Sequence, residues 1–346
     1  MRSMNVRFPA PLRPGDLIAV TSPSSGVAAR HRDRLDFAVA TLRKRGYDVA
    51  VGSCMDGATH VSASATERAA ELTSFLTDPH IRAVIPPWGG ETAIDLVPLL
   101  DWNAIGAAEP TWFVGFSDIS TLITPMTLLT GVATLHGNNL MDTPYDVPAP
   151  LLSWLDIATM PTDSSFTQAS AGVYRAGTWD DWTAHPDVTD HTYNGAESWI
   201  RLDPGSEPVD VTGRLVGGCI ETLCNLAGTP FADVGRFASK YAPEGLIVYV
   251  EAAGDDAATI CRNLHGMRLA GFFSTARAVL VGRTSADDHP HLTQREAVLD
   301  ALGCLDVPII ADVECGHVPP YLPIVNGALE RLLYAGDDQS LTQTLV

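Results

Sequence analysis

Short apolar runs alternate with longer segments of helical periodicity in the first part of the chain. The apolar runs end in loops rich in glycine, serine and proline, which is typical of buried strands followed by turns. The predicted strands are 16–22, 47–51, 82–86 and 112–116. The predicted helices are 28–45, 66–77, 91–100 and one that begins after Ser117. This alternation predicts a parallel sheet covered on both faces, with ligands at the carboxyl ends of its strands.

The pattern changes after about residue 148. Residues 161–208 are rich in Thr, Asp, Gly and Trp and show little periodicity, which indicates a functional segment or a crossing between domains. The alternation then resumes, with predicted strands at 209–215, 246–251, 278–282 and 307–311 and predicted helices at 220–226, 257–270 and 293–302. We therefore expect an α/β protein with an N-terminal domain (1–150), a Trp-rich crossing segment (151–208) and a C-terminal domain (209–346).

Composition narrows the class of protein. A length of 346 residues agrees with about two domains, and 46% hydrophobic with 18% charged residues is ordinary for a globular chain. The net charge of −19 argues against nucleic-acid polymers and anionic membranes as partners, because both require clustered basic residues. The N-terminus lacks the apolar run of a signal peptide, and 119–135 is too short and polar to span a bilayer. We therefore expect a soluble, cytoplasmic protein.

The cysteines and the most metal-like segment do not predict a metal site. The six cysteines are scattered without a C-x-x-C pair, so we expect buried free thiols. Residues 287–291 (Asp-Asp-His-Pro-His) have ligand side chains but lie in a polar loop, which favours a solvated loop. Cys315 is a weak candidate nucleophile, because nothing nearby in the sequence would lower its pKa. We expect no metal and no cofactor.

The sharpest local signal is the segment 114–118, Val-Gly-Phe-Ser-Asp. An apolar strand ends at a glycine and Ser117 opens a helix, which is the context of a nucleophile elbow. The helix N-terminus would place free N–H groups beside the hydroxyl, and the amide of Asp118 could meet an oxyanion. The pattern is imperfect, because Ile119 stands where such elbows commonly have glycine. The alternative is that Ser117 only caps the helix.

A paired glycine follows another predicted strand, in Trp88-Gly89-Gly90. Adjacent glycines let backbone N–H groups approach a substrate or an oxyanion closely. The alternative is an ordinary strand-to-helix turn that requires positive φ.

Two further strand ends carry residues suited to acyl transfer. Glu251 closes an apolar strand, where it could orient and stabilise an imidazolium; alternatively it is an exposed strand-end residue. His317 lies in a loop fixed by glycine and proline just past a strand, where it could act as a general base. His136, also at a strand end, is a rival base. The chain order Ser117, Glu251, His317 also occurs in α/β-hydrolases.

Taken together, these segments resemble those of the LD-carboxypeptidase family of serine peptidases. The resemblance extends from about residue 14 to 335, and the ordered set of motifs is more specific than any one of them. The matching stretches are 89–90, 99–102, 113–120, 213–223, 247–251, 269–271, 279–283, 307–310, 316–317 and 322–327.

The resemblance implies a fold and a set of residue roles. It implies a flavodoxin-like N-terminal α/β domain that holds the nucleophile and a C-terminal α/β domain that contains a β-barrel. The family's nucleophile corresponds to Ser117, its Glu to Glu251, its His to His317, and its oxyanion amides to Asp118 and Gly90. It further implies a homodimer that needs no cofactor.

The resemblance also implies two classes of substrate. One branch releases D-Ala from murein tetrapeptides in cell-wall recycling; the microcin C immunity branch detoxifies peptidyl- or aminoacyl-nucleotides. Residues 217–223 and the tryptophans of the crossing segment, Trp179, Trp182 and Trp199, resemble the second branch, which stacks aromatic side chains on a base. The alternative for these tryptophans is packing at an interface.

We therefore predict a serine hydrolase of amide bonds near a peptide C-terminus. Its catalytic residues are those named above, and the predicted substrate contacts are Trp88, Gly89 and Trp182. Release of D-Ala is the alternative reaction, and a non-catalytic, two-lobed binding protein is the alternative class.

Overall fold

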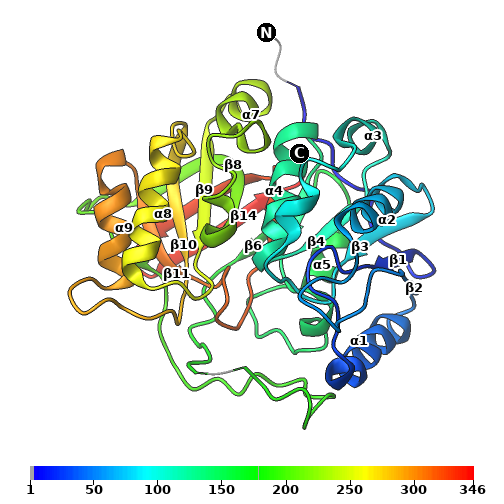
Figure 1. The fold of residues 1–346 in the computed structure, drawn as a ribbon. Coiled ribbons are helices and arrows are strands. Elements are labelled where there is room, and N and C mark those ends of the chain that lie inside the picture. Colours follow the sequence, from blue (N-terminus) through cyan, green and yellow to red (C-terminus); the bar gives the residue numbers. More distant parts are fainter. Residues whose placement is uncertain (1–3, 178) are drawn as a thin grey trace.

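The structure, a computed structural model, describes residues 4–177 and 179–346, which form two α/β lobes lying side by side (Figure 1). The first sheet has the strand order β12-β5-β4-β3-β1-β2. Its strands are β1 (Leu17–Val20), β2 (Asp48–Val51), β3 (Ile81–Ile85), β4 (Trp112–Gly115), β5 (Thr134–His136) and β12 (Ile324–Asn326). The first five are parallel and β12 pairs antiparallel with β5. The order 2-1-3-4-5 is that of flavodoxin-like folds, as predicted.

Five helices in the described residues pack with this sheet, and of these α1 and α2 are amphipathic whereas α4 is buried on nearly all sides. They are α1 (Arg32–Lys44), α2 (Ala65–Thr77), α3 (Trp102–Ala107), α4 (Ser120–Thr130) and α5 (Trp154–Ala158). Ser64 starts α2 through a reciprocal capping box with Glu67. The predicted helix 91–100 is wrong: only the 3-10 turn Ala93–Leu96 forms, because Pro98 has no N–H to continue a helix.

The second sheet has the order β6-β14-β13-β8-β9-β10-β11-β7. Its strands are β6 (Ser165–Gln168), β7 (Ile200–Arg201), β8 (Val209–Cys219), β9 (Leu246–Glu251), β10 (Ala276–Gly282), β11 (Ile309–Val313), β13 (Leu329–Ala335) and β14 (Asp338–Thr344). The remaining helices are α6 (Ile220–Leu223), α7 (Val234–Tyr241), α8 (Ala257–Leu269) and α9 (Gln294–Leu302). The two-domain α/β class is confirmed. The expected barrel is not closed in the described residues. The eight strands form an open sheet whose two edges are the short strands β6 and β7.

Helix α4 lies between the two sheets and fastens one lobe to the other (Figure 1). The Thr124 hydroxyl donates to the Gly217 carbonyl over 2.7 Å, and the Cys219 amide donates to Ser120 Oγ over 3.1 Å. A Cβ on Gly218 would lie 2.8 Å from Ser120 Oγ, so only glycine permits this approach. The docking brings the carboxyl ends of β4 and β9 to one place.

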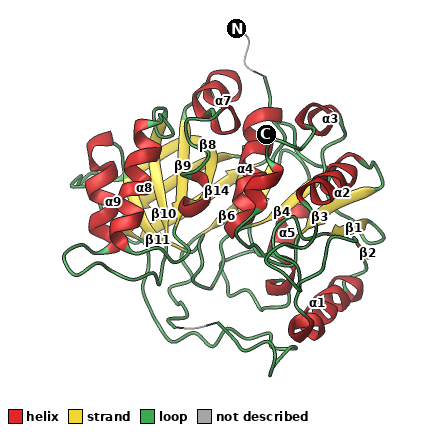
Figure 2. Ribbon diagram, in the orientation of Figure 1, coloured by secondary structure: helices red, strands yellow, loops and turns green. Residues whose placement is uncertain are grey.

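The crossing segment contains α5, β6 and β7, and its residues between β6 and β7 are irregular where the structure describes them and run in loops along the lower edge of the molecule (Figure 2). Arg34 of α1 holds it there, because its guanidinium donates to the carbonyls of Pro186 (3.0 Å) and Val188 (2.7 Å). None of the helices in the described part of the chain is long and apolar enough to cross a membrane.

All six cysteines are free, as predicted. Burial holds fully for Cys54, Cys219 and Cys315, whereas Cys304 is exposed and corrects the expectation of uniformly buried thiols. Cys304 lies in a 3-10 turn that follows α9 rather than in a packed strand, which explains its exposure.

Candidate active site

Ser117 stands on a strained turn at the end of β4. Its φ is +63°, and the 3-10 turn Ser117–Ile119 leads from it into α4. The residue at the N-cap position is Phe116, so the interpretation of Ser117 as the cap is wrong. Positive φ is uncommon for a serine and is the conformation of a nucleophile elbow. Among the described residues the Ser117 hydroxyl donates no hydrogen bond, and the side chain borders an open cavity.

The carboxylate of Asp118 fastens the loops around this turn. Its Oδ2 accepts hydrogen bonds from Ser24 Oγ (2.6 Å) and the Ala93 amide (2.9 Å), and its Oδ1 accepts from Thr121 Oγ1 (3.2 Å). The sequence indicated only a role for the backbone amide of Asp118. The side chain is 3% exposed, so its role follows from burial, which a single sequence does not reveal.

The glycine turn lies directly against the serine. A Cβ on Gly89 would stand 3.0 Å from Ser117 Oγ, and one on Gly90, whose φ is +147°, would overlap Ser24. Trp88 is anchored beside them by a 3.0 Å hydrogen bond from its indole N–H to the Ser25 carbonyl. Gly90 is therefore required by its positive φ and the close approach of Ser24, and Gly89 borders the Ser117 hydroxyl.

Glu251 and His317 form a pair in which Glu251 is fully buried and His317 is partly exposed to the cavity. Nδ1 of His317 lies 2.7 Å from Oε2 of Glu251, whose side chain is fully buried at the end of β9. The interpretation of Glu251 as an exposed strand end is therefore wrong. Oε1 of Glu251 lies 3.7 Å from Nε2 of His136, so two imidazoles flank one carboxylate.

The ionisation of this pair follows from its contacts. Burial alone would raise the pKa of Glu251, but the charge of His317 and the polar contacts with both histidines lower it to about 2. Burial would lower the pKa of His317, and the negative charge of Glu251 outweighs that effect and raises it. The carboxylate thus stays ionised and favours an imidazolium beside it.

A cavity of about 250 Å³ opens above these groups. Its lining residues are Trp88, Gly89, Phe116, Ser117, Asn139, Asp142, Trp179, Asp180, Trp182 and His317. The cavity therefore brings together five of the predicted site residues, including Ser117 and His317. Glu251 lies behind His317 and does not line the cavity.

Asp142 is a cavity residue that the sequence analysis missed. It is 3% exposed, and its Oδ1 has no hydrogen-bond partner within the described part of the chain. Burial raises its pKa to about 7, although the charges of Arg34 and His317 counteract this rise. Its position in the 3-10 turn Leu140–Asp142, far from any motif, gave no sequence signal.

The tryptophans of the crossing segment have two different environments. The Trp182 indole N–H donates to the Tyr145 hydroxyl over 2.8 Å, and the Arg34 guanidinium lies 5.0 Å from its ring. Trp179 is 48% exposed at the cavity rim. Trp199 is buried and donates to Glu314 Oε2 over 2.6 Å, so it serves packing.

The rival candidates fall elsewhere. His136 is buried beside Glu251 and is not among the cavity-lining residues. Cys315 is buried, and desolvation raises its pKa well above the usual value, so it is no nucleophile. Around the cavity, the described residues contain no metal-binding cluster; the one group of that kind in the described chain lies between α8 and α9.

Comparison with known proteins assigns the chain to a family. Residues 18–137 match the LD-carboxypeptidase N-terminal domain and residues 212–332 the LD-carboxypeptidase C-terminal domain. The microcin C7 self-immunity protein MccF of Escherichia coli is 26% identical, covering 96% of this chain and 95% of its own length. The murein tetrapeptide carboxypeptidase of Pseudomonas aeruginosa is 24% identical, covering 71% of this chain and 69% of its own.

The fold agrees with solved structures as well. The structure of MccF in complex with glutamyl sulfamoyl guanosine superposes with a TM-score of 0.81 at 21% identity, covering 97% of this chain and 98% of that one. The two domain matches together span more than half of the sequence, and the chain therefore belongs to the LD-carboxypeptidase family of serine peptidases.

Proposed function

We propose that Ser117, His317 and Glu251 act as a catalytic triad that hydrolyses an amide bond. The observation that carries the proposal is the 2.7 Å contact of His317 with the buried Glu251, with His317 and the strained Ser117 lining one cavity. A carboxylate that orients an imidazole, with a serine at an elbow, is the arrangement of serine hydrolases on unrelated folds.

The mechanism follows from the roles of these groups. Ser117 Oγ attacks the carbonyl carbon while His317 Nε2 takes its proton, and Glu251 holds the Nδ1–H tautomer and stabilises the imidazolium. The amides of Gly90 and Asp118 donate to the oxyanion. His317 then protonates the leaving nitrogen, the C–N bond breaks, and an acyl-enzyme forms. Water, deprotonated by His317, hydrolyses the ester and restores Ser117.

The aromatic walls of the cavity support a peptidyl- or aminoacyl-nucleotide as substrate. Trp88, Trp179 and Trp182 line the cavity, and indole rings stack on bases with little dependence on sequence. MccF, a relative along nearly the whole chain, was solved with glutamyl sulfamoyl guanosine and with aspartyl sulfamoyl adenosine. We propose that this chain cleaves the acyl bond of a compound of that kind.

Release of D-Ala from a murein tetrapeptide is the second candidate function. It is favoured by the likeness to the murein tetrapeptide carboxypeptidase, which is partial in coverage. The two reactions use the same triad and differ in the leaving group, so a single assay separates them.

The test is a substrate panel read by mass spectrometry. Purified protein is incubated with aminoacyl sulfamoyl adenosines and with murein tetrapeptide, and the panel is repeated with Ser117→Ala and with Ser239→Ala, which changes an exposed serine of α7. We expect Ser117→Ala to lose at least about 10⁴-fold in kcat on the preferred substrate and Ser239→Ala to be unaffected.

Full turnover by Ser117→Ala would refute the mechanism, and predominant release of D-Ala would select the second function. A serine-directed acylating probe addresses the non-catalytic alternative. We expect the probe to label the wild type at Ser117; tight nucleotide-peptide binding without any labelling would instead identify a binding protein.

A further inference from the structure

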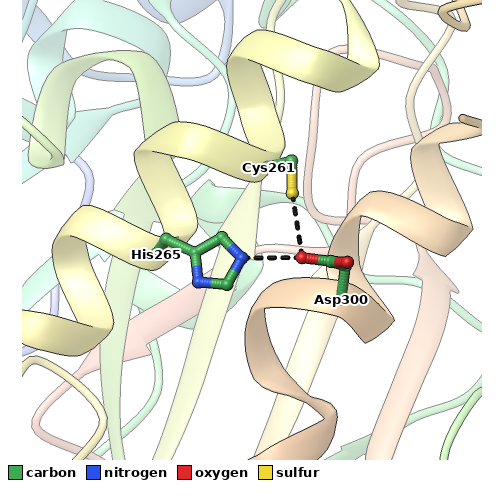
Figure 3. A group of neighbouring side chains, drawn as sticks. All are labelled: Cys261, His265 and Asp300. Carbon is green, nitrogen blue, oxygen red and sulfur yellow. Dashed lines mark hydrogen bonds and ion pairs between the residues drawn. The ribbon is translucent and has the colours of Figure 1, made fainter.

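Three side chains with metal-binding atoms meet on the outer face of the C-terminal lobe. Helices α8 and α9 pack side by side there (Figure 1). Figure 3 shows Cys261 and His265 of α8 pointing toward Asp300 of α9. His265 Nε2 lies 2.7 Å and Cys261 Sγ 3.5 Å from the same carboxylate oxygen, Oδ1 of Asp300. None of the three lines the catalytic cavity.

We propose that Cys261, His265 and Asp300 form a second site, which binds a divalent transition metal of the zinc class. A thiolate, an imidazole and a carboxylate form the mixed donor set that zinc accepts, whereas magnesium and calcium prefer oxygen alone. The site is separate from the proposed hydrolase chemistry, and its occupation cross-links two helices.

The local structure fits this use. Cys261 and His265 are four residues apart, so they stand on one face of α8, one turn from each other. The apolar face of the same helix, formed by Ala257, Ile260, Leu264 and Met267, is buried. The two ligands are thus held by a packed helix, and neither contributes to its core.

The spacing requires only small movements. Tetrahedral zinc with bonds of about 2.0–2.3 Å separates its ligand atoms by about 3.3–3.8 Å. The three donor atoms here all lie within 4.8 Å of one another, and one pair is already at 3.5 Å. The pair at 2.7 Å must open, which a rotation of the exposed Asp300 carboxylate allows. Solvent would complete the fourth position.

Arg268, a neighbour of His265, makes metal binding less favourable. Nη2 of Arg268 lies 3.2 Å from Nδ1 of His265, which therefore accepts while Nε2–H donates to Asp300. When Nε2 binds a metal, the proton moves to Nδ1, and a guanidinium can no longer donate to it. A glutamine at this position could accept that proton through its amide oxygen, as groups behind metal-bound histidines commonly do. Arg268→Gln should therefore tighten binding.

The thiol also has to lose its proton. Burial and the Asp300 carboxylate raise the pKa of Cys261 in the absence of metal. Binding then exchanges the S–H bond for an S–metal bond and releases one proton to the solvent. His265, Arg268 and Asp300 are the titratable or charged groups in contact with this thiol or with its partners.

The experiment titrates the chelator-treated full-length protein with Co²⁺, as a spectroscopic probe, and with Zn²⁺. We expect the wild type to bind one equivalent of cobalt per chain and to show a thiolate-to-cobalt charge-transfer band. The band should be absent from Cys261→Ser. In His265→Gln the affinity for cobalt should fall at least tenfold. Arg268→Gln should bind several-fold more tightly. Far-UV circular dichroism confirms that each variant is folded.

The matched control is the double variant His289→Ala/His291→Ala, in the exposed loop that carries the other metal-type residues of this lobe. It should keep the cobalt band and the affinity. The proposal is overturned by the absence of a band in the wild type, by a band that persists in Cys261→Ser, or by a band lost only in the histidine-loop variant. None of these readouts depends on hydrolase activity.

Discussion

Two buried carboxyls near the cavity that Ser117 borders, Glu251 and Asp142, have pKa values that are shifted in opposite directions. Both side chains are at most 3% exposed. At Glu251 the charge of His317, 2.7 Å away, outweighs burial and the pKa falls to about 2, whereas at Asp142 burial outweighs the charges of Arg34 and His317 and the pKa rises to about 7. The difference teaches that burial does not set the charge of a carboxyl; the groups within hydrogen-bonding distance do.

The largest effect is expected from neutralising Glu251. In Glu251→Gln the shape is retained but the imidazole of His317 loses its charged partner, and the glutamine amide can favour the wrong tautomer. We expect kcat to fall by about 10⁴-fold on the substrate found in the panel. Steady-state kinetics with mass-spectrometric product detection measures it.

The matched control for this change is Glu330→Gln. Glu330 is also fully buried, on β13 of the same sheet, burial raises its pKa, and it does not line the cavity. Its replacement should leave kcat unchanged. Equal losses in the two variants would mean that the effect at Glu251 is structural.

Whereas Glu251→Gln should lower kcat, Asp142→Asn should raise the free energy of unfolding. The pKa of this carboxyl is raised from 3.8 to about 7, so ionisation costs the folded state free energy as the pH rises from 4 to 7. The asparagine variant avoids this cost. We expect it to gain up to about 4 kcal/mol of unfolding free energy over the wild type at pH 8, and much less at pH 4.

Urea denaturation at the two pH values measures this gain. Asp36→Asn, which changes an exposed carboxylate of α1, is the control and should show no such pH dependence. A gain at Asp142 that is equal at pH 4 and pH 8 would contradict the raised pKa.

The pH dependence of kcat/KM in the wild type reports the effect of Glu251 on the pKa of His317, and the expected change is smaller than those above. His317 must be neutral to accept the proton, and Glu251 raises its pKa above 6.5. Activity should therefore decline as the pH falls through that raised value, giving an acidic limb of kcat/KM above 6.5. In Glu251→Gln the limb of the residual activity should move to lower pH, whereas Glu330→Gln should leave it in place.

The smallest effect concerns Asp118, whose buried carboxylate is satisfied by neutral donors. Ser24→Ala removes one of them and leaves the Ala93 amide and Thr121 in place. We expect a loss of about 1 kcal/mol in unfolding free energy, measured by thermal or urea denaturation against the neutral Ser239→Ala. A loss as large as that of a buried ion-pair deletion would show that Asp118 depends on Ser24 alone.

The features that could be predicted from the sequence are those formed by residues that follow one another closely in the chain. The elbow at Ser117 and the carboxylate at the end of β9 were recognisable because a strand, a turn and a reactive side chain follow one another directly. The parallel order of the first sheet followed from the alternation of elements. The helix predicted at 91–100 failed at one residue, Pro98.

What the sequence did not reveal depends on distant contacts. The orphaned oxygen of Asp142 and the fastening of Asp118 by Ser24 arise from loops brought together only in the folded chain. Strand β12 was not predicted, because it has only three residues and pairs with β5, which lies far away in the sequence. The hairpin β13–β14 was also not predicted, although its two strands pair locally with each other.

Strand β12 has a consequence for how the protein is synthesised. Residues Ile324–Asn326, near the end of the chain, pair with β5 and complete the sheet whose other strands all come from the first 136 residues. While the ribosome is still making the second lobe, β5 has a bare edge, and unpaired edges invite aggregation or chaperone binding. The half that carries Ser117 is therefore finished only after residues Ile324–Asn326 have been made, so a product truncated before them lacks a completed first lobe.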